Sequence, residues 1–310
     1  MKHYELNYCK NFKCKAGGCE HTCCAKWEID VDARAIKRLA LLGENDERVK
    51  RGFDEKTKTL KTDENRRCLF LDDDGLCYII KKYGERVLPF VCKTHPRFKN
   101  FFTGRVETGL GLACEEAARK ILSLNGKMCL VLLRDTREEA HLSRIERSII
   151  LFRNKAVSIA NDKTRSVSDR VKTLLTLASA REELVLPKNI ANALLQTDFL
   201  EPSIKELYAK TLSLTPDLNP FCGFENAAAS LLSYFIFRHV SRASDQTDLK
   251  VRLAFAVYSL FAVFYLAKAL GGDNIAALTE AARTYSAEVE YSDDNTHFLL
   301  DYAEGFIKLI

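Results

Sequence analysis

The spacing of apolar residues predicts helices along most of the second half of the chain. Within residues 137–161, apolar side chains recur every three or four positions, which places them on one face of a helix. Further predicted helices, separated by breaks rich in Pro, Gly or Asp, cover residues 167–180, 189–195, 201–212, 224–240, 249–270, 275–289 and 296–309. We therefore expect the chain to be helical nearly throughout from residue 115 onward.

The first 114 residues follow a different pattern, with short apolar runs between polar stretches. Residues 27–42 place Asp30 and Asp32 ahead of an apolar repeat of helical spacing, which predicts a short helix opened by acidic residues. Residues 44–67 are almost all charged or polar, which favours an exposed loop or a small hairpin. This part of the chain is therefore expected to contain little regular structure.

Together the two patterns predict a mainly α protein. Residues 1–120 are expected to form a cysteine-rich metal-binding region, packed on a helical bundle formed by residues 121–310. No fixed-period repeat is present, so a bundle is favoured over a solenoid. With 310 residues, of which 47% are hydrophobic and 29% charged, the chain has the composition of an ordinary folded protein and can bury a sizeable core without disulfides.

Charge and hydropathy argue against two classes of partner. A net charge of +5 is a mild excess for this length, so no nucleic acid partner is expected. The first residues contain no apolar segment of the kind found in a signal peptide. The most apolar stretch, residues 253–267, is shorter than the ~20 residues that span a membrane. We expect a cytoplasmic protein with no membrane partner.

Cysteines are the main chemical signal in the sequence. Cytosolic thiols stay reduced, so a structural disulfide framework does not explain the 11 cysteines of this chain. A short segment that also contains Gly17 and Gly18 holds four of them, and thiolates in a flexible loop can converge on a zinc or iron centre. The eight candidate metal ligands are Cys14, Cys19, Cys23, Cys24, Cys68, Cys77, Cys92 and Cys114.

The spacing of these cysteines leaves the metal and its ligand sets open. Eight thiols can form two four-ligand sites, with zinc, an iron–sulfur cluster or both, or a single cluster with the other thiols structural. Adjacent Cys23 and Cys24 point in different directions in most backbone conformations, so they are expected to serve different roles. A turn at residues 72–75 is expected to bring Cys68 and Cys77 together. A radical S-adenosylmethionine motif is excluded, because Lys26 stands where its third cysteine would be.

The remaining cysteines and two histidines are expected to have no direct metal role. Free cysteine often behaves as a small buried hydrophobic residue, which is the interpretation for Cys9, Cys129 and Cys222. His21 and His95 are expected to be surface groups or to lie next to a metal site without binding the metal.

Five segments carry a resemblance to a known family. They are FKCKAGGCEHTCCAKWEIDVD, RCLFLDDDGLC, VCKTHPRF, LACEEAARKIL and FENAAASLLSYFIFRHV, at residues 12–32, 67–77, 91–98, 112–122 and 224–240. In this order they resemble the flagellin lysine-N-methylase family. The resemblance implies methyl transfer from S-adenosylmethionine to lysine side chains of flagellin in the bacterial cytoplasm. It also implies a cysteine-ligated iron–sulfur cluster, of the 4Fe-4S type, with zinc as the alternative.

A non-catalytic function is the alternative to the enzyme. The same cysteines suit a zinc- or iron-binding interaction module or a metal carrier whose helical half binds a partner. Lysine methylation requires a neutral amine and therefore a proton acceptor, but no spacing in the sequence identifies a catalytic base. Catalytic and donor-binding residues therefore stay unassigned. The partner expected for the enzyme is flagellin or another protein with accessible lysines.

Overall fold

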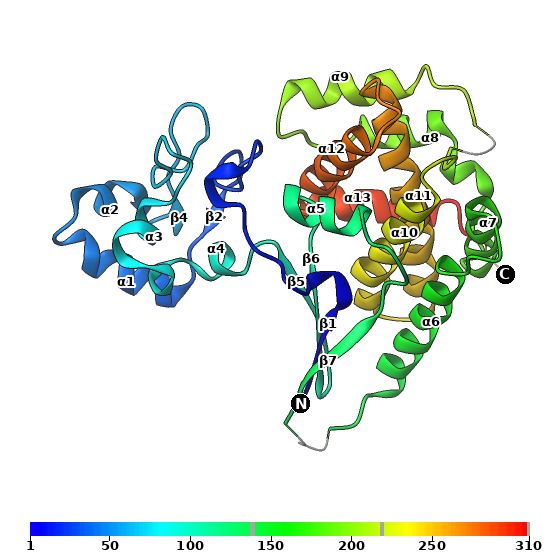
Figure 1. Cartoon of the computed structure of the whole chain (residues 1–310), viewed down its shortest axis with the longest axis horizontal. Helices are drawn as coiled ribbons and strands as arrows, with labels where there is room; N and C mark the ends of the chain where they lie inside the picture. The colour runs from blue at the N-terminus through cyan, green and yellow to red at the C-terminus, as the bar shows by residue number, and fades with distance from the viewer. Residues whose placement is uncertain (137–139, 218–219, 309–310) are drawn as a thin grey trace. The chain divides into compact units, whose positions relative to one another are not determined.

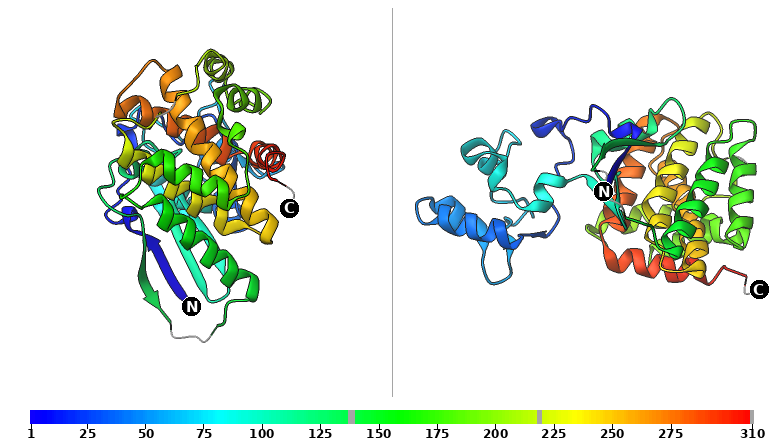
Figure 2. Two further views of the ribbon diagram at one scale, coloured as in Figure 1. Left: turned by 90° about the vertical axis from the view of Figure 1, so that its right-hand side faces the viewer. Right: turned by 90° about the horizontal axis from the view of Figure 1, so that it is seen from below.

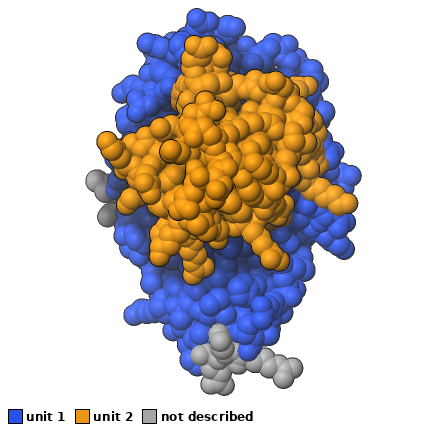
Figure 3. Space-filling model, turned by 90° about the vertical axis from the view of Figure 1, so that its left-hand side faces the viewer, with its two compact units in different colours: residues 1–12, 98–113, 117–310 blue, residues 13–97, 114–116 orange. Residues whose placement is uncertain are grey.

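A computed structural model describes residues 1–136, 140–217 and 220–308. The chain divides into two compact units, which Figure 3 shows in different colours. The helical unit comprises residues 1–12, 98–113 and 117–310, and the cysteine-rich unit comprises residues 13–97 and 114–116. The cysteine-rich unit is therefore inserted into the chain of the helical unit. The domain division expected at residue 120 stays a prediction.

The helical unit confirms the expected mainly α class (Figure 1). Its α-helices are α5 (Glu115–Leu122, whose first two residues belong to the cysteine-rich unit), α6 (Arg144–Ala160), α7 (Val167–Leu177), α8 (Pro187–Leu194), α9 (Pro202–Thr211), α10 (Glu225–His239), α11 (Gln246–Ala269), α12 (Ile275–Tyr285) and α13 (Asp293–Glu304). Shorter turns are the 3-10 helices η1 (Asn7–Cys9), η4 (Glu182–Val185) and η5 (Val240–Arg242), and the π-helix η6 (Ser286–Glu290).

Helix α11 is the centre of this unit. It contacts α7, α8, α9, α10, α12 and α13, and Figure 2 shows the helices of this unit packed together in two further views. Its side chains from Leu253 to Tyr265 are all buried, as expected for a helix that is apolar on every side. By length and composition alone α11 is long and apolar enough to cross a membrane, but 89% of its most apolar window is buried within the protein. We interpret it as the core helix of the bundle.

Capping residues explain where several helices begin. Ser143 accepts a hydrogen bond from the backbone N–H of Glu146, whose carboxylate accepts one from the backbone N–H of Ser143. The helix predicted over residues 137–161 therefore begins at Arg144, and residues 137–139 lie outside the described chain. The helix predicted over residues 296–309 instead runs from Asp293 to Glu304, and residue 309 is not described.

A four-stranded sheet completes the helical unit. Its strands are β1 (Lys2–Leu6), β5 (Arg97–Phe102), β6 (Arg105–Leu110) and β7 (Leu130–Asp135), in the order β5-β6-β1-β7. Strand β1 is parallel to β6, with Lys2 opposite Arg105, and antiparallel to β7. The prediction that the chain is helical nearly throughout from residue 115 onward is therefore wrong at β7. Its apolar run is strand because it pairs with β1 at the edge of the sheet.

The three cysteines outside the candidate ligands have different environments. Cys9 is buried, as expected, and only 4% of its surface is exposed. Cys129 and Cys222 are exposed, so the expectation that they are core residues is wrong. Cys129 directly precedes β7, whose side chains Val131, Leu132 and Leu133 are themselves exposed.

The cysteine-rich unit contains more regular structure than the sequence predicts. Its elements are η2 (Ala16–Gly18), β2 (Ile29–Asp30), α1 (Ala33–Gly43), α2 (Glu47–Gly52), β3 (Phe53–Asp54), β4 (Thr59–Leu60), α3 (Tyr78–Tyr83), η3 (Glu85–Val87) and α4 (Phe90–Thr94). The helix expected over residues 27–42 begins only at Ala33, because Asp32 caps it by accepting the N–H groups of Arg34 and Ala35. The expected hairpin is present as β3–β4, but α2 precedes it.

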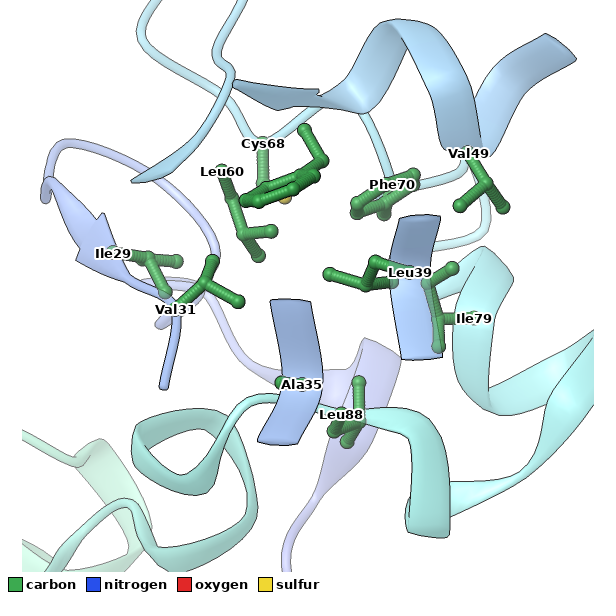
Figure 4. Close-up of a cluster of buried hydrophobic side chains, with 11 residues drawn as sticks. Ile29, Val31, Ala35, Leu39, Val49, Leu60, Cys68, Phe70, Ile79 and Leu88 are labelled. Carbon is green, nitrogen blue, oxygen red and sulfur yellow. The ribbon is translucent and has the colours of Figure 1, made fainter. Parts of the chain in front are cut away.

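A small hydrophobic cluster holds the cysteine-rich unit together (Figure 4). It joins residues from its helices and strands, and Cys68 is one of its buried members beside Leu60. Its full membership is Ile29, Val31, Ala35, Leu39, Val49, Phe53, Leu60, Cys68, Phe70, Ile79 and Leu88. Gly52 allows close packing here, because a Cβ at this position would lie 2.5 Å from the ring of Phe70.

Asp46 joins two parts of this unit by hydrogen bonds. It caps α2, accepting the N–H groups of Arg48 and Val49, and it also accepts from the hydroxyls of Tyr78 and Tyr83 at 2.8 and 2.7 Å. Burial alone would raise the pKa of Asp46, but its hydrogen bonds, including those from both tyrosines, hold that pKa well below the ordinary 3.8. The carboxylate therefore connects α2 to α3.

Two buried ionic networks stabilise the helical unit. Arg153 is fully buried; it pairs with Glu107 and donates to the hydroxyl of Ser241 at 2.9 Å. Elsewhere, Tyr234 donates to the carboxylate of Glu290 at 2.8 Å. Burial of these polar groups is possible because each finds a hydrogen-bonding or charged partner.

Candidate metal centre

The segment from Cys14 to Cys24 folds as a tight loop against the turn at residues 72–75. The backbone N–H of Ala16 donates to the sulfur of Cys14 at 3.3 Å. Gly17 lies against the turn so closely that a Cβ there would be 2.4 Å from the carbonyl oxygen of Asp74. Gly75, at φ +74°, also lies close to Gly17, because a Cβ at Gly75 would be 2.9 Å from the Cα of Gly17. Two glycines therefore permit the approach of two cysteine-bearing segments.

Glu115 ties this loop to Cys114. Its carboxylate accepts the backbone N–H of Glu20 at 2.9 Å and that of His21 at 3.4 Å, and it pairs with the ammonium of Lys15 at 2.5 Å. The hydrogen bonds and the ion pair lower the pKa of Glu115 against the opposing effect of burial. Because Glu115 is the residue after Cys114, these contacts place Cys114 next to the loop.

Cys24 belongs to a different environment from Cys14. The backbone N–H of Cys68 donates to the carbonyl oxygen of Cys24 at 2.8 Å. Cys24, Cys77 and Cys92 are partly buried against the hydrophobic cluster of which Cys68 is a member. The predicted turn at residues 72–75 is present and makes Cys77 a bridge partner of Leu71, so Cys68 and Cys77 do come together.

The eight candidate cysteines therefore gather in two sets. We call Cys14, Cys19, Cys23 and Cys114 the loop set. We call Cys24, Cys68, Cys77 and Cys92 the core set. All eight are reduced and lie in the cysteine-rich unit, whereas Cys9, Cys129 and Cys222 lie in the helical unit.

The pKa values of the thiols reflect this grouping. Burial, Glu115 and the thiols of Cys114 and Cys14 raise the pKa of Cys19 to about 11. Burial and the thiols of Cys24, Cys68 and Cys77 raise the pKa of Cys92 to about 12. Cys19 is thus affected by two other thiols of the loop set and Cys92 by three other thiols of the core set, so these thiols lie close to their partners.

Cys23 and Cys24 connect the two sets. A hydrogen bond between these neighbouring thiols raises the pKa of Cys23 and lowers that of Cys24 to about 7. The hydroxyl of Thr22 also accepts the backbone N–H of Cys24 at 3.2 Å. An exposed cysteine of the loop set and a partly buried cysteine of the core set are therefore adjacent in the sequence.

The donor chemistry of both sets fits a thiophilic metal. Each has four thiols, the ligand number of tetrahedral zinc and of common iron–sulfur clusters. Within the described residues, no three His, Cys, Asp or Glu side chains form a ready-made metal cage. Closing either set around an ion therefore requires the thiol side chains to rotate and lose their protons. Burial lowers the pKa of His95 to about 4, so its ring is neutral at pH 7.

Sequence reasoning missed the residues that position these cysteines. Glu115 had one available signal, its place directly after Cys114. Gly17 was identified as a flexible residue, but its close contact with the turn becomes visible only in three dimensions. Asp46 had the weaker signal of a capping residue ahead of a short polar helix.

The helical unit also contains a hollow of about 550 Å³, which falls in the size range of small-molecule sites. Aromatic side chains of Phe224 and Phe264 line it, together with the ion pair between Lys268 and Asp217, whose atoms are 2.5 Å apart. Cys222 lies at the same hollow.

Comparison with known proteins gives this arrangement a context. Residues 13–109 match the family model CxxCxxCC, described as "Putative zinc- or iron-chelating domain". The chain is 25% identical over 177 residues to proteins named Lysine-N-methylase from Salmonella choleraesuis (strain SC-B67) and Salmonella typhimurium (strain LT2). The chain is similar to the lysine-N-methylases. The expected resemblance to the flagellin lysine-N-methylase family is thus confirmed, at modest identity.

The likeness to the lysine-N-methylases covers part of each chain. The alignments include 52% of this chain and 44% of each methylase, so the chain matches less than half the length of those relatives. A further relative, "Flagellar biosynthetic protein FliU" of Salmonella muenchen, is 26% identical over 137 residues, which are 41% of this chain and 80% of that protein. No solved structure matches the chain. The CxxCxxCC match contains seven of the eight candidate cysteines, and Cys114 lies beyond it.

Proposed function

We propose that this chain is a protein-lysine N-methyltransferase that acts on flagellin in the bacterial cytoplasm. S-Adenosylmethionine is the methyl donor, and the cysteine-rich unit holds a 4Fe-4S iron–sulfur cluster. The observation that carries the proposal is the similarity over 177 residues to proteins named Lysine-N-methylase. It is supported by a second observation, the gathering of eight thiols in one compact unit that matches a chelating domain.

The proposed reaction sets clear requirements for the protein. The lysine nitrogen attacks the methyl carbon of the sulfonium, the carbon–sulfur bond breaks, and S-adenosylhomocysteine leaves with the electron pair on sulfur. The amine must first lose a proton, and nitrogen, carbon and sulfur must lie in line. The hollow of the helical unit has aromatic and charged walls, and its volume falls in the range of small-molecule sites.

The cysteine-rich unit contributes a metal site to this proposal. The eight candidate cysteines would hold the metal, and bonds from the thiolates to a bound cluster would fix segments that are far apart in sequence. In the protein itself, Glu115 already orients the loop that contains Cys14 and Cys19, and the hydrophobic cluster already positions Cys68. Contacts other than metal–thiolate bonds therefore position these cysteine-bearing segments.

The activity is tested directly with protein purified without oxygen. The protein is incubated with flagellin and S-adenosylmethionine carrying an isotopically labelled methyl group, and the flagellin is then analysed by peptide mass spectrometry. Labelled methyl groups on lysine side chains are expected, and flagellin with acetylated lysines is the matched control. Absence of label on flagellin and on other lysine-bearing proteins, together with absence of donor binding in calorimetry, would overturn the enzymatic proposal.

The metal is identified by measuring iron, zinc and acid-labile sulfide in the same preparation. Equal amounts of iron and sulfide are expected for a 4Fe-4S cluster. Zinc without sulfide would show that the cysteines bind zinc and not an iron–sulfur cluster. The methyl transfer would still be tested by the labelling experiment.

A second candidate is a non-catalytic zinc- or iron-binding interaction module or metal carrier. The observation that favours it is that the family model describes only a chelating domain, while the chain matches less than half of each methylase. This candidate predicts that the protein binds metal but does not bind S-adenosylmethionine. Calorimetry with the donor therefore separates the two functions.

A further inference from the structure

We propose that the eight cysteines form two separate four-thiolate metal centres, one from the loop set and one from the core set. This inference rests on the metal-binding part of the proposed function and deepens it. It assigns the ligands of each centre and predicts that the two centres differ in their access to solvent.

The loop set is assembled from two distant parts of the chain. The contacts of Glu115 with Lys15, Glu20 and His21 hold Cys114 beside the loop that contains Cys14 and Cys19. Each of these contacts falls on a residue adjacent to a loop cysteine or two positions from it. Cys14 and Cys23 are exposed, and Cys19 and Cys114 are partly exposed. A centre formed here would lie at the surface of the cysteine-rich unit.

The core set is assembled around the hydrophobic cluster. The backbone bond between Cys68 and Cys24 and the bridge between Ala25 and Arg67 hold the backbone of Cys24 beside the segment that contains Cys68. The turn at residues 72–75 reverses the chain, so that Cys77 lies beside the segment that contains Cys68. Helix α4 supplies Cys92, and Asp32 fixes its start by accepting the backbone N–H of Phe90 at 2.7 Å. No thiol of this set is fully exposed.

The division differs from a grouping by proximity in sequence alone. By proximity in sequence, Cys14, Cys19, Cys23 and Cys24 would form one centre and the four later cysteines another. In the structure, Cys24 instead belongs with three of the later cysteines, and Cys114 belongs with three of the early ones. The two groupings therefore predict different effects of substituting Cys24 or Cys114.

Two double variants separate the alternatives. The full-length protein is stripped of metal under reducing, oxygen-free conditions and titrated with Co²⁺, whose absorption reports tetrahedral thiolate binding. We expect two equivalents of tightly bound Co²⁺ in the unchanged protein. Cys14→Ser/Cys114→Ser removes two thiols of the loop set and should leave one equivalent. Cys14→Ser/Cys24→Ser removes one thiol from each set and should leave none.

Several outcomes would overturn the proposal. The opposite result, with no site left in the first double variant and one site left in the second, would support grouping by sequence proximity. A single equivalent in the unchanged protein, or loss of both sites in Cys14→Ser alone, would indicate one shared centre. Cys129→Ser is the matched control, because it removes an exposed thiol of the helical unit and should keep both equivalents. Far-UV circular dichroism confirms that each variant is folded.

A second measurement addresses accessibility and does not depend on variants. On addition of a strong chelator to the Co²⁺-loaded protein, we expect two phases of metal loss of equal amplitude. The faster phase should be absent in Cys14→Ser/Cys114→Ser. A single phase in the unchanged protein would contradict two centres of different exposure. Because these readouts need no methyl transfer, a protein that holds two ions but methylates no lysine would keep this inference and lose the enzymatic function.

Discussion

Substitution of Gly17 provides a sharp test of how the cysteine-rich unit positions its loop. A Cβ at this position would lie 2.4 Å from the carbonyl oxygen of Asp74, whereas real Cβ atoms essentially never approach closer than 3.0 Å. Gly17→Ala must therefore move the loop away from the turn by about 0.6–1 Å, since the obstacle is backbone. At Gly18 the nearest atom is the Cβ of Lys15, 4.0 Å away, so Gly18→Ala needs no such movement.

The size of the effect follows from this overlap. Inserting a methyl group into a packed site costs about 1–3 kcal/mol. If this free-energy cost opposes closure of the loop set around its ion, the affinity for Co²⁺ should fall by roughly 5- to 150-fold in Gly17→Ala. Gly18→Ala should stay within about two- to fivefold of the unchanged protein, because replacing glycine at an unstrained position changes stability by only about 0.4–1 kcal/mol.

The assay uses protein that carries Cys92→Ser, so that the loop set is the intact set of four thiols. Co²⁺ is titrated in competition with a chelator of known affinity, and the fluorescence of Trp27, the sole tryptophan of the sequence, reports whether the unit remains folded. Trp27 packs against the hydrophobic cluster and is therefore well placed for this purpose. Equal affinities for Gly17→Ala and Gly18→Ala would refute the reasoning that contact with the turn positions the loop.

Four further predictions concern side chains that stabilise the cysteine-rich unit or the helical unit. Glu115→Gln removes a charged acceptor from the loop and should weaken Co²⁺ binding by the loop set about fivefold in the same titration. Asp46→Asn should lower the free energy of unfolding in urea, followed by Trp27 fluorescence, by about 1–3 kcal/mol, because the hydroxyls of Tyr78 and Tyr83 lose a carboxylate acceptor, whereas the amide oxygen can still cap α2. Since the pKa of Asp46 is held below 3.8, its contribution should be present above about pH 4 and be lost as the pH falls further, a dependence that Asp46→Asn should flatten. Glu107→Gln leaves Arg153 buried without its counter-charge and should cost about 3–5 kcal/mol by circular dichroism.

Each of these predictions has a contradicting result. Unchanged affinity in Glu115→Gln would show that the loop does not depend on that carboxylate. A loss below about 1 kcal/mol in Asp46→Asn, or an unchanged acid dependence, would remove Asp46 as a link between α2 and α3. A Glu107→Gln variant as stable as the unchanged protein would mean that Arg153 finds another acceptor.

Sequence patterns predicted most helices of the helical unit but none of the four strands of its sheet. Helices such as α6 and α7 follow from local repeats and caps, which are visible in a single stretch of sequence. The apolar run in β7 is compatible with a buried helix as well as with a strand. What decides between them is pairing with β1, where Leu6 lies opposite Leu130, and such pairing is not encoded locally.

The sequence predicted which cysteines belong to the candidate site, but not how they divide into two sets. Eight cysteines could be selected because four of them crowd one glycine-containing loop and four more follow in the same half of the chain. That neighbouring Cys23 and Cys24 differ in role could also be expected from backbone geometry. Which cysteines join which set could not, because it depends on contacts over long sequence separations, such as that of Glu115 with Glu20, 95 residues apart.

The insertion of the cysteine-rich unit into the helical unit has a consequence for synthesis of the protein. Strand β1 pairs with β6, and the hydroxyl of Tyr8 donates to the carbonyl oxygen of Leu110, 102 residues later. On the ribosome, β1 therefore emerges long before its parallel partner, and the whole cysteine-rich unit emerges between them. Folding of the cysteine-rich unit in this interval would shorten the effective loop that the sheet must close, so pairing of β1 with β6 should be faster when that unit is already folded.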